Sequence, residues 1–303
     1  MPRFSSARKQ AIRSIRHKTA IGESRDQNIN KQIHSYGTER NYIDQLTQVG
    51  EWLVYNGNRQ GTSNISPNLA IAYLEERAEY VIQKTLDLDR QALQTLKSLK
   101  NFKLPVIKSS IGQTGRLGKQ SRAYTFQQID LIKMKQSDRF SFATELIQAT
   151  GIRAQEMYTL RPIEYRNPTS GRNWSEHLFK GLEGKIYTVQ GKGGLVRAVM
   201  IPSEIAHELE KHRHDSVEGV RDRRIIYKSL YDVTGGQNWS QNFSKTSKFL
   251  FEWSNGGHGL RHGYAQRRMK TLQMHGFLYK QALEIVSQEM GHFRPEITET
   301  YLR

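Results

Sequence analysis

The 303-residue chain contains no cysteine, which excludes disulfide bonds and thiolate metal ligands. A chain without cysteine fits a reducing compartment. No apolar run approaches the roughly 18 residues that a membrane-spanning helix needs. Residues 1–18 carry six basic side chains but no continuous apolar segment, so the sequence predicts no secretory signal there.

Acidic residues are also scarce. The chain has 29 Asp and Glu against 46 Lys and Arg, which leaves a net charge of +17 and a pI near 9.9. A mean hydropathy of −0.70 indicates a heavily hydrated surface. Strongly basic chains of this size typically bind nucleic acid, because their cationic side chains release counterions from phosphates. A cationic surface that serves only solubility is the alternative.

The length of the chain predicts two domains, because 303 residues exceed what one hydrophobic core usually serves. We divide the sequence into a basic N-terminal arm at 1–25, a helical domain at 26–104, a basic linker at 105–122 and a second domain at 123–303. The arm is expected either to lie along a DNA backbone or to be a solvated tail. Glycines and cationic residues in the linker predict a flexible, positively charged connection.

Periodic apolar residues predict three helices in the first domain. One covers about Thr38–Val54, and a second begins at Ser66-Pro67, where serine caps the helix and proline occupies its first turn. A third covers about Leu86–Leu99. The Leu and Tyr residues of these segments are expected to form a small core, with no residue that suggests catalysis.

The second domain is expected to combine helices with one β-hairpin. Helical patterns cover Phe140–Thr150 and, after Gly151, the segment Ile152–Leu160. Two strands, Lys185–Gln190 and Leu195–Ile201, flank a glycine-rich turn. Further helices are expected at Ile205–Arg213, Gly259–Lys270 and Tyr279–Met290, with a last one carrying Ile297 and Tyr301. The predicted fold class is therefore mainly α with a small β-hairpin or sheet.

The C-terminal stretch holds the densest set of candidate functional residues. His258 and Arg261 lie three residues apart, so on a helix they share one face and reach the same anion. His292 and Tyr301 follow, and a turn between them would bring both to that point. Arginine binds phosphate oxygens, imidazoles move protons and a phenol attacks phosphorus, so this combination favours a phosphodiester substrate. Zinc binding by His258 and His262 is a lesser alternative, because no H-E-x-x-H pattern is present.

Two earlier segments contribute a candidate arginine and a candidate lysine. Arg153 follows the junction at Gly151, and Glu156 lies three residues later, which by itself indicates an ordinary ion pair along one helix. Lys192 lies between glycines in the predicted hairpin turn, and by itself it fits a solvated lysine at a hairpin tip. The order of these segments along the chain is more informative than any one of them.

The motifs, taken in order, resemble those of the tyrosine recombinase (phage integrase) family. They are Ala149-Thr150-Gly151-Ile152-Arg153-x-x-Glu156, Gly191-Lys192-Gly193, His258-x-x-Arg261-His262, Met290-Gly291-His292 and Tyr301. The resemblance covers the second domain, 123–303. Residues 26–104 are similar to that family's core-binding domain, with weaker motif support.

The resemblance implies roles for five residues that bind the phosphate or transfer its protons. Arg153 and Arg261 match the two catalytic arginines, which clamp the scissile phosphate and stabilise its pentacoordinate transition state. Lys192 matches the hairpin lysine that protonates the departing 5′ oxygen. His258 would assist proton transfer, and His292 would hydrogen-bond the phosphate.

The resemblance further implies that Tyr301 is the nucleophile. It would form a 3′-phosphotyrosyl link and free a 5′ hydroxyl. Glu156 matches an acidic position that would orient neighbouring groups. Because the ester conserves the energy of the broken bond, resealing would need neither ATP nor a metal, so no cofactor is expected.

The same resemblance implies what the chain acts on. It predicts a two-domain clamp on double-stranded DNA with inverted-repeat half-sites, as a dimer on one site and a tetramer in the synapse. Accessory DNA-bending or directionality factors are candidate partners. We expect an integrase of a mobile element, located in the bacterial cytoplasm on nucleoid DNA. A replicon-dimer resolvase or a type IB topoisomerase shares the chemistry, and a non-catalytic DNA-binding regulator on this scaffold is the alternative outside the enzymes.

One departure from the family concerns the end of the chain. Only Leu302 and Arg303 follow Tyr301, whereas relatives usually continue into a segment that docks on a neighbouring subunit. This leaves open how subunits associate, and whether Tyr301 acts in its own subunit or in another.

Overall fold

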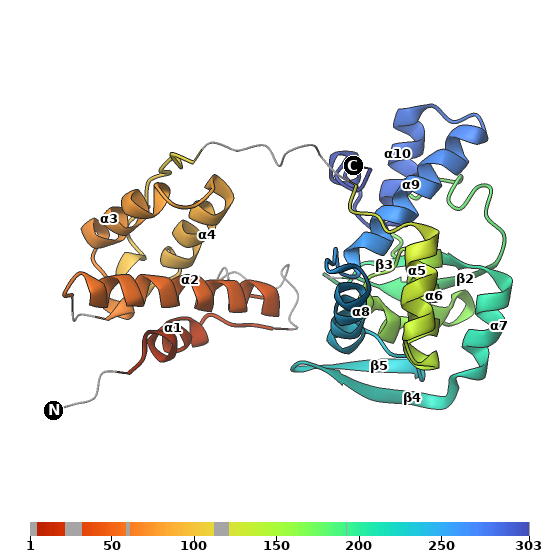
Figure 1. Ribbon diagram of the computed structural model, residues 1–303, viewed down its shortest axis with the longest axis horizontal. Helices are drawn as coiled ribbons and strands as arrows, with labels where there is room; N and C mark the ends of the chain where they lie inside the picture. Colours follow the sequence, from red (N-terminus) through yellow and green to blue (C-terminus); the bar gives the residue numbers. More distant parts are fainter. Residues whose placement is uncertain (1–4, 22–31, 59–60, 112–120, 192, 303) are drawn as a thin grey trace. The chain divides into compact units, whose positions relative to one another are not determined.

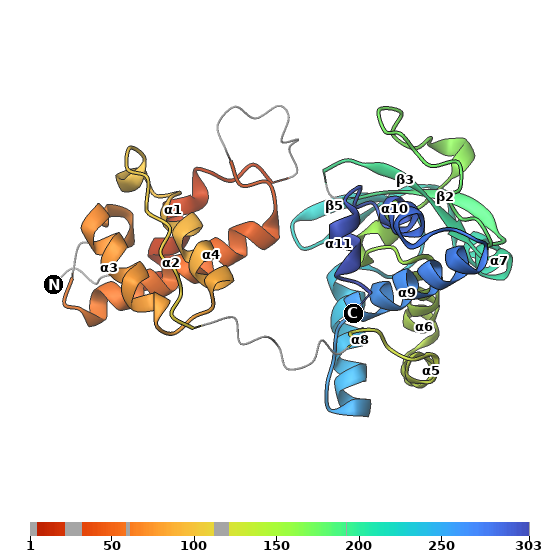
Figure 2. The ribbon, with the colours of Figure 1, turned by 90° about the horizontal axis from the view of Figure 1, so that it is seen from above.

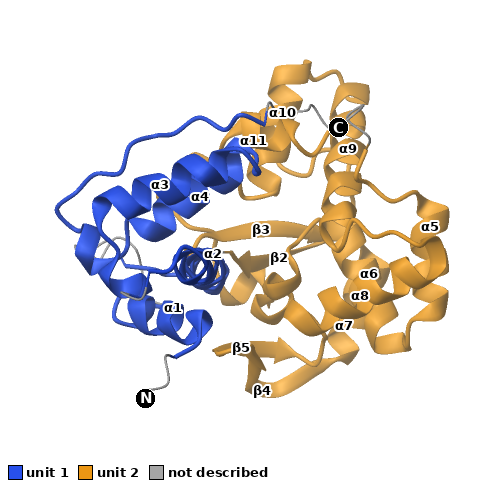
Figure 3. Ribbon diagram, turned by 60° about the vertical axis from the view of Figure 1, so that its left-hand side comes forward, with its two compact units in different colours: residues 1–118 blue, residues 119–303 orange. Residues whose placement is uncertain are grey.

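A computed structural model describes residues 5–21, 32–58, 61–111, 121–191 and 193–302. The chain divides into two compact units, Met1–Gly118 and Lys119–Arg303, which Figure 3 draws in separate colours. Helices dominate both units, and all strands of the described residues belong to the second (Figure 1). No helix in the described ranges is both long and apolar enough to cross a membrane.

The first unit is a small helical bundle. Its helices are α1 (Ala7–Arg16), α2 (Tyr36–Tyr55), α3 (Pro67–Ala78) and α4 (Gln83–Leu93), with the short 3-10 helices η1 (Thr62–Asn64) and η2 (Lys97–Leu99). Ser6, Ser35 and Ser66 each cap a helix by accepting a backbone N–H. The predicted third helix is shorter than expected, because α4 ends at Leu93 and the chain then buries Leu99 through η2.

Helix α1 lies within the stretch that was expected to be a basic arm. Ala11 and Ile15 are buried in the core of the first unit. A Cβ on Gly50 of α2 would lie 2.9 Å from the Cβ of Ala7, so the two helices pack in close contact. The sequence reading missed this helix because its few apolar residues are spread among basic ones.

The stretch that was expected to be a linker is attached to the first unit over its initial part. Ile107 is partly buried against the core of the first unit, and the hydroxyl of Ser109 donates to the carbonyl of Val81 over 2.5 Å. The backbone N–H of Ser109 also donates to the Gln83 side chain over 2.9 Å. The glycines of the expected linker, at 112, 115 and 118, lie outside the described residues.

The second unit begins with two helices and a three-stranded antiparallel sheet. In order, the elements are α5 (Phe126–Lys135), α6 (Asp138–Thr150), η3 (Ala154–Thr159), β1 (Arg161–Pro162), η4 (Ile163–Tyr165), β2 (Lys185–Gln190) and β3 (Val196–Ile201). The strand order is β1-β2-β3, and the register of the hairpin pairs Val189 with Arg197. The predicted β-hairpin is thereby confirmed.

The rest of the second unit adds a second hairpin and five helices. They are α7 (Ser203–Lys211), β4 (Arg213–Asp222), β5 (Ile225–Tyr231), α8 (Gly236–Phe251), α9 (His258–Met274), α10 (Tyr279–Glu289) and α11 (Pro295–Glu299). Helices α9 and α10 lie side by side in Figures 1 and 2 and share a small hydrophobic core. The main core joins α5, α6 and α8 to the three-stranded sheet.

Four features of the second unit differ from the sequence expectations. The β4–β5 hairpin was missed because most of β4 is exposed on both faces and so lacks the alternation of a half-buried strand. Helix α8 was missed because its buried face relies on Trp239, Phe243 and small residues amid many polar ones. The segment after Arg153 is a 3-10 helix rather than an α-helix, and the helix expected to reach Arg213 ends at Lys211.

The left-handed turn at Gly151 sets how the chain leaves α6 toward Arg153. Gly151 ends α6 with φ at +63°, a region that favours glycine. A Cβ at this position would lie 2.5 Å from Cδ1 of the buried Tyr264 ring. Backbone conformation and packing against α9 therefore both require glycine here.

We predict that Gly151→Ala destabilises the second unit by about 1–3 kcal/mol through backbone strain, and by roughly 1–3 kcal/mol more through the clash with Tyr264. Gly276→Ala is the matched control, since Gly276 has φ at +87° but nothing lies within 4 Å of its added Cβ. Urea unfolding of the two variants measures the difference. Equal losses would contradict the close packing at Gly151.

Candidate active site

The first part of the site is the turn after α6, which carries Arg153 and Glu156. The backbone N–H of Arg153 donates to Oε2 of Glu156 over 2.8 Å, and Nη1 donates to Oε1 over 2.7 Å. Glu156 has no exposed surface. This is more than the ordinary surface ion pair that the spacing alone indicated, because the carboxylate fixes both the backbone and the guanidinium of Arg153.

Arg261 lies on the first turn of α9 and is buried, with 2% of its surface exposed. It donates through Nη1 to the carbonyl of Gly151, and through Nη2 to the carbonyl of Met290 over 3.2 Å. Its Nε has no hydrogen-bond partner in the described residues. Arg261 therefore ties the end of α6 to the end of α10 and keeps one unsatisfied donor.

His292 follows the turn at the end of α10. Its Nε2 lies 3.4 Å from Nη2 of Arg261, and its Nδ1 lies 3.1 Å from the hydroxyl of Thr298. Because arginine only donates, Nε2 accepts and the ring proton is on Nδ1. Burial, followed by the charges of Arg261, Arg153 and Arg197, lowers the pKa of His292 to about 3. The imidazole is therefore neutral at neutral pH.

Tyr301 lies two residues after α11, among the imidazoles of its own chain. Its ring centroid is 4.7 Å from that of His262, 5.1 Å from that of His292 and 6.1 Å from that of His258. The guanidinium carbon of Arg261 lies 5.7 Å from the same centroid. The structure thus brings the expected nucleophile to the arginine cluster within a single chain.

His262 and His258 hold different positions around Tyr301. His262 is buried, and its Nδ1 lies 3.1 Å from the backbone carbonyl of Tyr301, so Nδ1 donates this bond. Burial, followed by the charge of Arg122, lowers the pKa of His262 to about 4, although the bond to Tyr301 acts in the opposite direction. Partial burial, followed by the charge of Arg261, likewise lowers the pKa of His258.

These bonds bear on the zinc alternative for His258 and His262. His262 uses Nδ1 to hold the backbone of Tyr301. In the part of the chain that the structure describes, no group of three or more His, Asp or Glu side chains could hold a metal ion.

Lys192 itself lies outside the described residues. Its neighbour Gly191 lies against the site, since a Cβ there would be 3.0 Å from Oε1 of Glu156 and 3.7 Å from Nη1 of Arg153. The hairpin strand that leads to Lys192 therefore ends beside the arginine cluster.

Arg197 is a site residue that the sequence reading missed. It lies on β3 with 1% of its surface exposed, and its Nη2 donates to Oε2 of Glu156 over 2.6 Å. The alternating burial of β3 places Arg197 on the same inward face as Val199 and Ile201. An arginine at an inward position of a strand was the available signal, because a buried guanidinium needs a carboxylate or carbonyl partner.

The charges of the site are unbalanced. Burial alone would raise the pKa of Glu156, but Arg197, Arg153 and Arg261 together lower it to about 2. Burial and the charge of Arg153 lower the pKa of Arg261 to about 10, so this guanidinium stays charged at neutral pH. Three guanidiniums against one carboxylate leave a positive surplus, which suits an anion.

A second buried network supports the site from behind. Arg268 of α9 donates to both oxygens of Glu289 over 2.8 and 2.9 Å, and the hydroxyl of Tyr264 donates to the same carboxylate over 2.9 Å. Arg268 also donates to the carbonyl of Lys180 over 3.1 Å. This network ties α9 to α10 and holds Tyr264, the ring that packs against Gly151.

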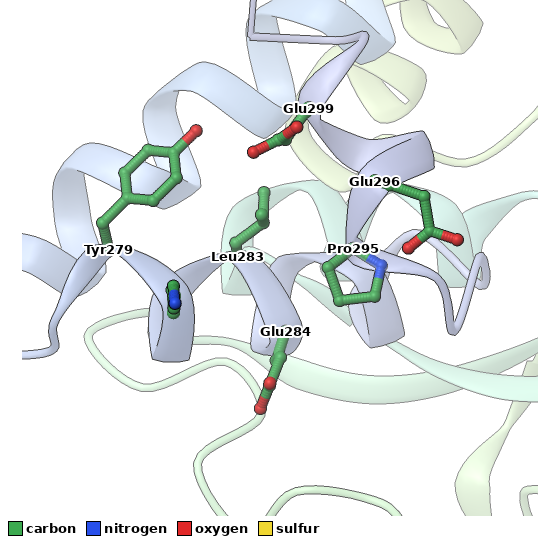
Figure 4. Close-up of a pocket in the computed structure, with 7 residues that line it drawn as sticks. Tyr279, Leu283, Glu284, Pro295, Glu296 and Glu299 are labelled. Atoms are coloured by element: carbon green, nitrogen blue, oxygen red, sulfur yellow. The ribbon is translucent and has the colours of Figure 1, made fainter.

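A surface cavity of about 280 Å³ lies between α10 and α11 (Figure 4), and none of the candidate site residues lines it. Its lining combines apolar side chains with one cation, that of Lys280, and the carboxylates of Glu284, Glu296 and Glu299. Three carboxylates against one ammonium leave a net negative charge, which disfavours a phosphate.

The arrangement is chemically suited to substitution at phosphorus. Two guanidiniums, Arg153 and Arg261, lie where they can bind the oxygens of one phosphate and stabilise charge that develops on it. Neutral imidazoles beside Tyr301 can accept or donate protons. The structure brings together every expected site residue that it describes.

No protein-family model matches the sequence, and no curated protein matches it with significant similarity.

Solved structures of tyrosine recombinases and integrases share the fold of this chain. A XerH site-specific recombinase bound to its difH substrate in a pre-cleavage complex is 17% identical, with a TM-score of 0.53 and coverage of 100% of this chain and 94% of that one. The Tn1549 transposon integrase in complex with circular intermediate DNA is 14% identical, with a TM-score of 0.51 and coverage of 99% and 95%. A lambda integrase dimer bound to a COC′ core site is 15% identical, with a TM-score of 0.50 and coverage of 89% of each chain. The likeness confirms the predicted fold class, mainly α with small sheets in two domains.

We predict that the free energy of unfolding decreases as the pH falls below about 6.5, partly because of His262. Its pKa is about 4 in the folded chain, below its ordinary value of 6.5, so between these values the unfolded chain binds more protons. The stability that depends on neutral His262 is present above that range and lost within it, by about 1 kcal/mol per pH unit.

Urea unfolding of the wild type and of His262→Gln between pH 7 and 4.5 measures this contribution. The other titrating groups contribute equally to the free energy of unfolding of both chains, so their effect cancels when one curve is subtracted from the other. The variant should show the shallower decline. Parallel curves would contradict a neutral, buried His262.

Proposed function

We propose that this chain, which has the fold of the tyrosine recombinases, is an enzyme that cuts and rejoins DNA strands through a 3′-phosphotyrosyl intermediate. The observation that supports this most is the meeting of Arg153, Arg261, His292 and Tyr301, which come from four separate segments of the chain. A regulator that only binds DNA would not need a tyrosine among two arginines and three imidazoles.

The proposed first step is an attack of the Tyr301 phenol oxygen on phosphorus. A bond forms between that oxygen and the phosphorus, and the bond from phosphorus to the 5′ oxygen breaks. Arg153 and Arg261 bind the non-bridging oxygens and stabilise the extra charge of the pentacoordinate state. The phenolic proton passes to a neighbouring base, a role that His258 can fill because its lowered pKa keeps it neutral at neutral pH.

The proposed departure of the 5′ oxygen requires a proton. Lys192 is our candidate for the general acid, and Gly191 beside Glu156 supports its delivery to the site. Rejoining reverses these steps, with a 5′ hydroxyl attacking the phosphotyrosyl ester. Because the ester conserves the bond energy, this scheme uses neither ATP nor a metal ion.

We further propose that Tyr301 acts on the phosphate held by its own subunit. Its ring lies 5.7 Å from the guanidinium carbon of Arg261 in the same chain. His262 holds its backbone carbonyl, and Thr298 of α11 is hydrogen-bonded to His292. These contacts favour cleavage in cis, and a neighbouring subunit would need to break them to supply its own tyrosine.

Double-stranded DNA with inverted-repeat half-sites is the proposed partner. A net charge of +17 supports binding to phosphates. The matched XerH structure contains its difH substrate, and the matched lambda integrase is a dimer on a core site. We propose a dimer on one site, a tetramer in the synapse, and accessory factors that bend DNA or set direction.

Integration and excision of a mobile element is the specific role that we favour. The likeness to the Tn1549 transposon integrase supports it. The likeness to a XerH site-specific recombinase, at a similar TM-score, supports site-specific recombination in general, and a replicon-dimer resolvase is the alternative role. The DNA beside the gene separates the two roles, because an adjacent repeat or tRNA end favours integration.

We predict that the protein forms an SDS-resistant adduct with a nicked suicide duplex of its own site, and that Tyr301→Phe binds the same duplex but forms none. Removing the phenol oxygen removes the nucleophile without changing the ring. Tyr279→Phe is the matched control, since Tyr279 is partly exposed on α10 and lies outside the cluster. An adduct with Tyr301→Phe would contradict the assignment, and a wild type that binds but never cleaves would favour the regulator.

We also predict a steep dependence of DNA binding on salt. Neutralising six to ten phosphates would weaken binding by about 10³- to 10⁵-fold between 50 and 200 mM salt. Fluorescence anisotropy with a labelled duplex measures this slope, and Tyr301→Phe should share it because it removes no charge. A nearly flat slope would contradict the proposed phosphate contacts.

A further inference from the structure

The Glu156 carboxylate is shared between two guanidiniums from different elements. Oε1 accepts from Arg153 over 2.7 Å, and Oε2 accepts from Arg197 of β3 over 2.6 Å. A carboxylate whose two oxygens are each bound by a different guanidinium cannot rotate without breaking one of these bonds. The position of Arg153 therefore depends on Arg197 through Glu156.

Arg197 also touches the turn that carries His292. A Cβ on Gly291 would lie 2.9 Å from both Cδ and Nε of Arg197. Gly291 has φ at +72°, which favours glycine, so backbone and packing requirements coincide at this contact. Arg197 thus lies where the hairpin, the turn after α6 and the turn after α10 meet.

Stability alone does not explain a buried arginine at this position. Nε and Nη1 of Arg197 have no hydrogen-bond partner in the described residues, and buried donors without partners are costly. An apolar residue on the inward face of β3, beside Val199, would avoid this cost. A functional use of the charge accounts for it better.

The charge balance supplies that use. With Arg153 as its only partner, Glu156 would cancel the charge of the arginine that has to attract a phosphate. With Arg197 present, the carboxylate has a separate counter-charge. We propose that Arg197 is a positioning residue for the phosphate site: it keeps the Glu156 carboxylate ionised and fixed, so that Glu156 orients Arg153 without neutralising it.

The charged and titratable groups around Glu156 come from four elements. They are Arg153 at the start of η3, Arg197 on β3, Arg261 on α9 and His292 after α10. His292 is neutral at neutral pH, so the three guanidiniums are what oppose the effect of burial on Glu156. Removing Arg197 removes the charge that has the largest lowering effect on its pKa.

The first experiment compares Arg197→Met with Arg268→Met. Arg268 is the matched control, because both arginine side chains are 2% exposed and each donates to a carboxylate with no exposed surface. Carbon-13 NMR of glutamate side-chain carboxyls, with the Glu156 signal identified by its loss in Glu156→Gln, follows the titration. Arg197→Met should move the Glu156 titration upward by about one pH unit or more, and Arg268→Met should leave it unchanged.

The second experiment measures single-turnover cleavage of a nicked duplex by the same variants, and it rests on the proposed function. Arg197→Met should cleave about 100-fold more slowly at pH 7, because Arg153 is misplaced. It should also gain an acid limb in its pH profile as Glu156 titrates. DNA affinity should change by less than about threefold, because the many other phosphate contacts dominate binding.

Arg197→Lys keeps the charge but lacks the planar fork. Glu156 in this variant should titrate near its wild-type range, while cleavage recovers to within about tenfold of wild type. This variant serves as the test if Arg197→Met does not fold, and an upward titration in Arg197→Lys would then overturn the proposal.

The two experiments separate the failure of this proposal from the failure of the proposed function. An unmoved Glu156 titration in Arg197→Met would overturn the charge role of Arg197. Equal rate losses and equal pH profiles for Arg197→Met and Arg268→Met would make Arg197 merely structural. A wild type that cleaves nothing would overturn the proposed function, while the titration would still decide the role of Arg197.

Discussion

The buried carboxylate of Glu156 holds together the face of the second unit on which the candidate site lies. Guanidiniums from η3, β3 and α9 would repel one another at close range, and burial strengthens that repulsion because little water screens it. Glu156 opposes all three charges, with Arg153 and Arg197 bound directly. The Glu156 carboxylate is fully compensated only when all three guanidiniums surround it. Correct placement of Glu156 therefore requires the hairpin, the turn after α6 and the start of α9 together.

The positive charge of the same arginines helps to set the protonation state of the neighbouring histidines. Burial and the neighbouring arginines keep His292 and His262 neutral, and their contacts define which ring nitrogen carries the proton. Those neutral rings hold the end of the chain, His262 through the carbonyl of Tyr301 and His292 through Thr298. Helix α11 has only five residues, too few to be stable by itself. The charges that suit a phosphate thus also position the candidate nucleophile.

Sequence reasoning found the candidate residues whose spacing carries information by itself. His258 and Arg261 share a helix face, and the motif order linked them to Arg153 and Tyr301. Arg197 was not predicted as a site residue because it belongs to none of the motifs. The alternation along β3 nevertheless places it on the inward face with Val199. The β4–β5 hairpin was not predicted because β4 is rich in charged residues and mostly exposed. Helix α1 was not predicted because basic residues separate the few apolar ones that pack in the core of the first unit. Pairings between distant segments depend on tertiary structure, which local patterns do not contain.

The two buried ion networks of the second unit, around Glu289 and around Glu156, differ in charge balance. This difference distinguishes a network that only joins helices from one that suits an anion. Arg268 and Glu289 form a one-to-one pair. Glu289 also accepts from the Tyr264 hydroxyl and from the backbone N–H of Phe179, and Arg268 also donates to a backbone carbonyl. Nothing in that network attracts a further ion. Around Glu156 three guanidiniums share one carboxylate. Buried donors without a partner in the described residues occur in both networks, on Arg197 and Arg261 in one and on Nη1 of Arg268 in the other, so the surplus of positive charge is what distinguishes the site around Glu156. Such a surplus is costly without an anion, so a phosphate bound at the candidate site would both compensate the charge and stabilise the fold around it. Under the proposed function, recognition of the DNA phosphate and completion of the candidate site would be the same event.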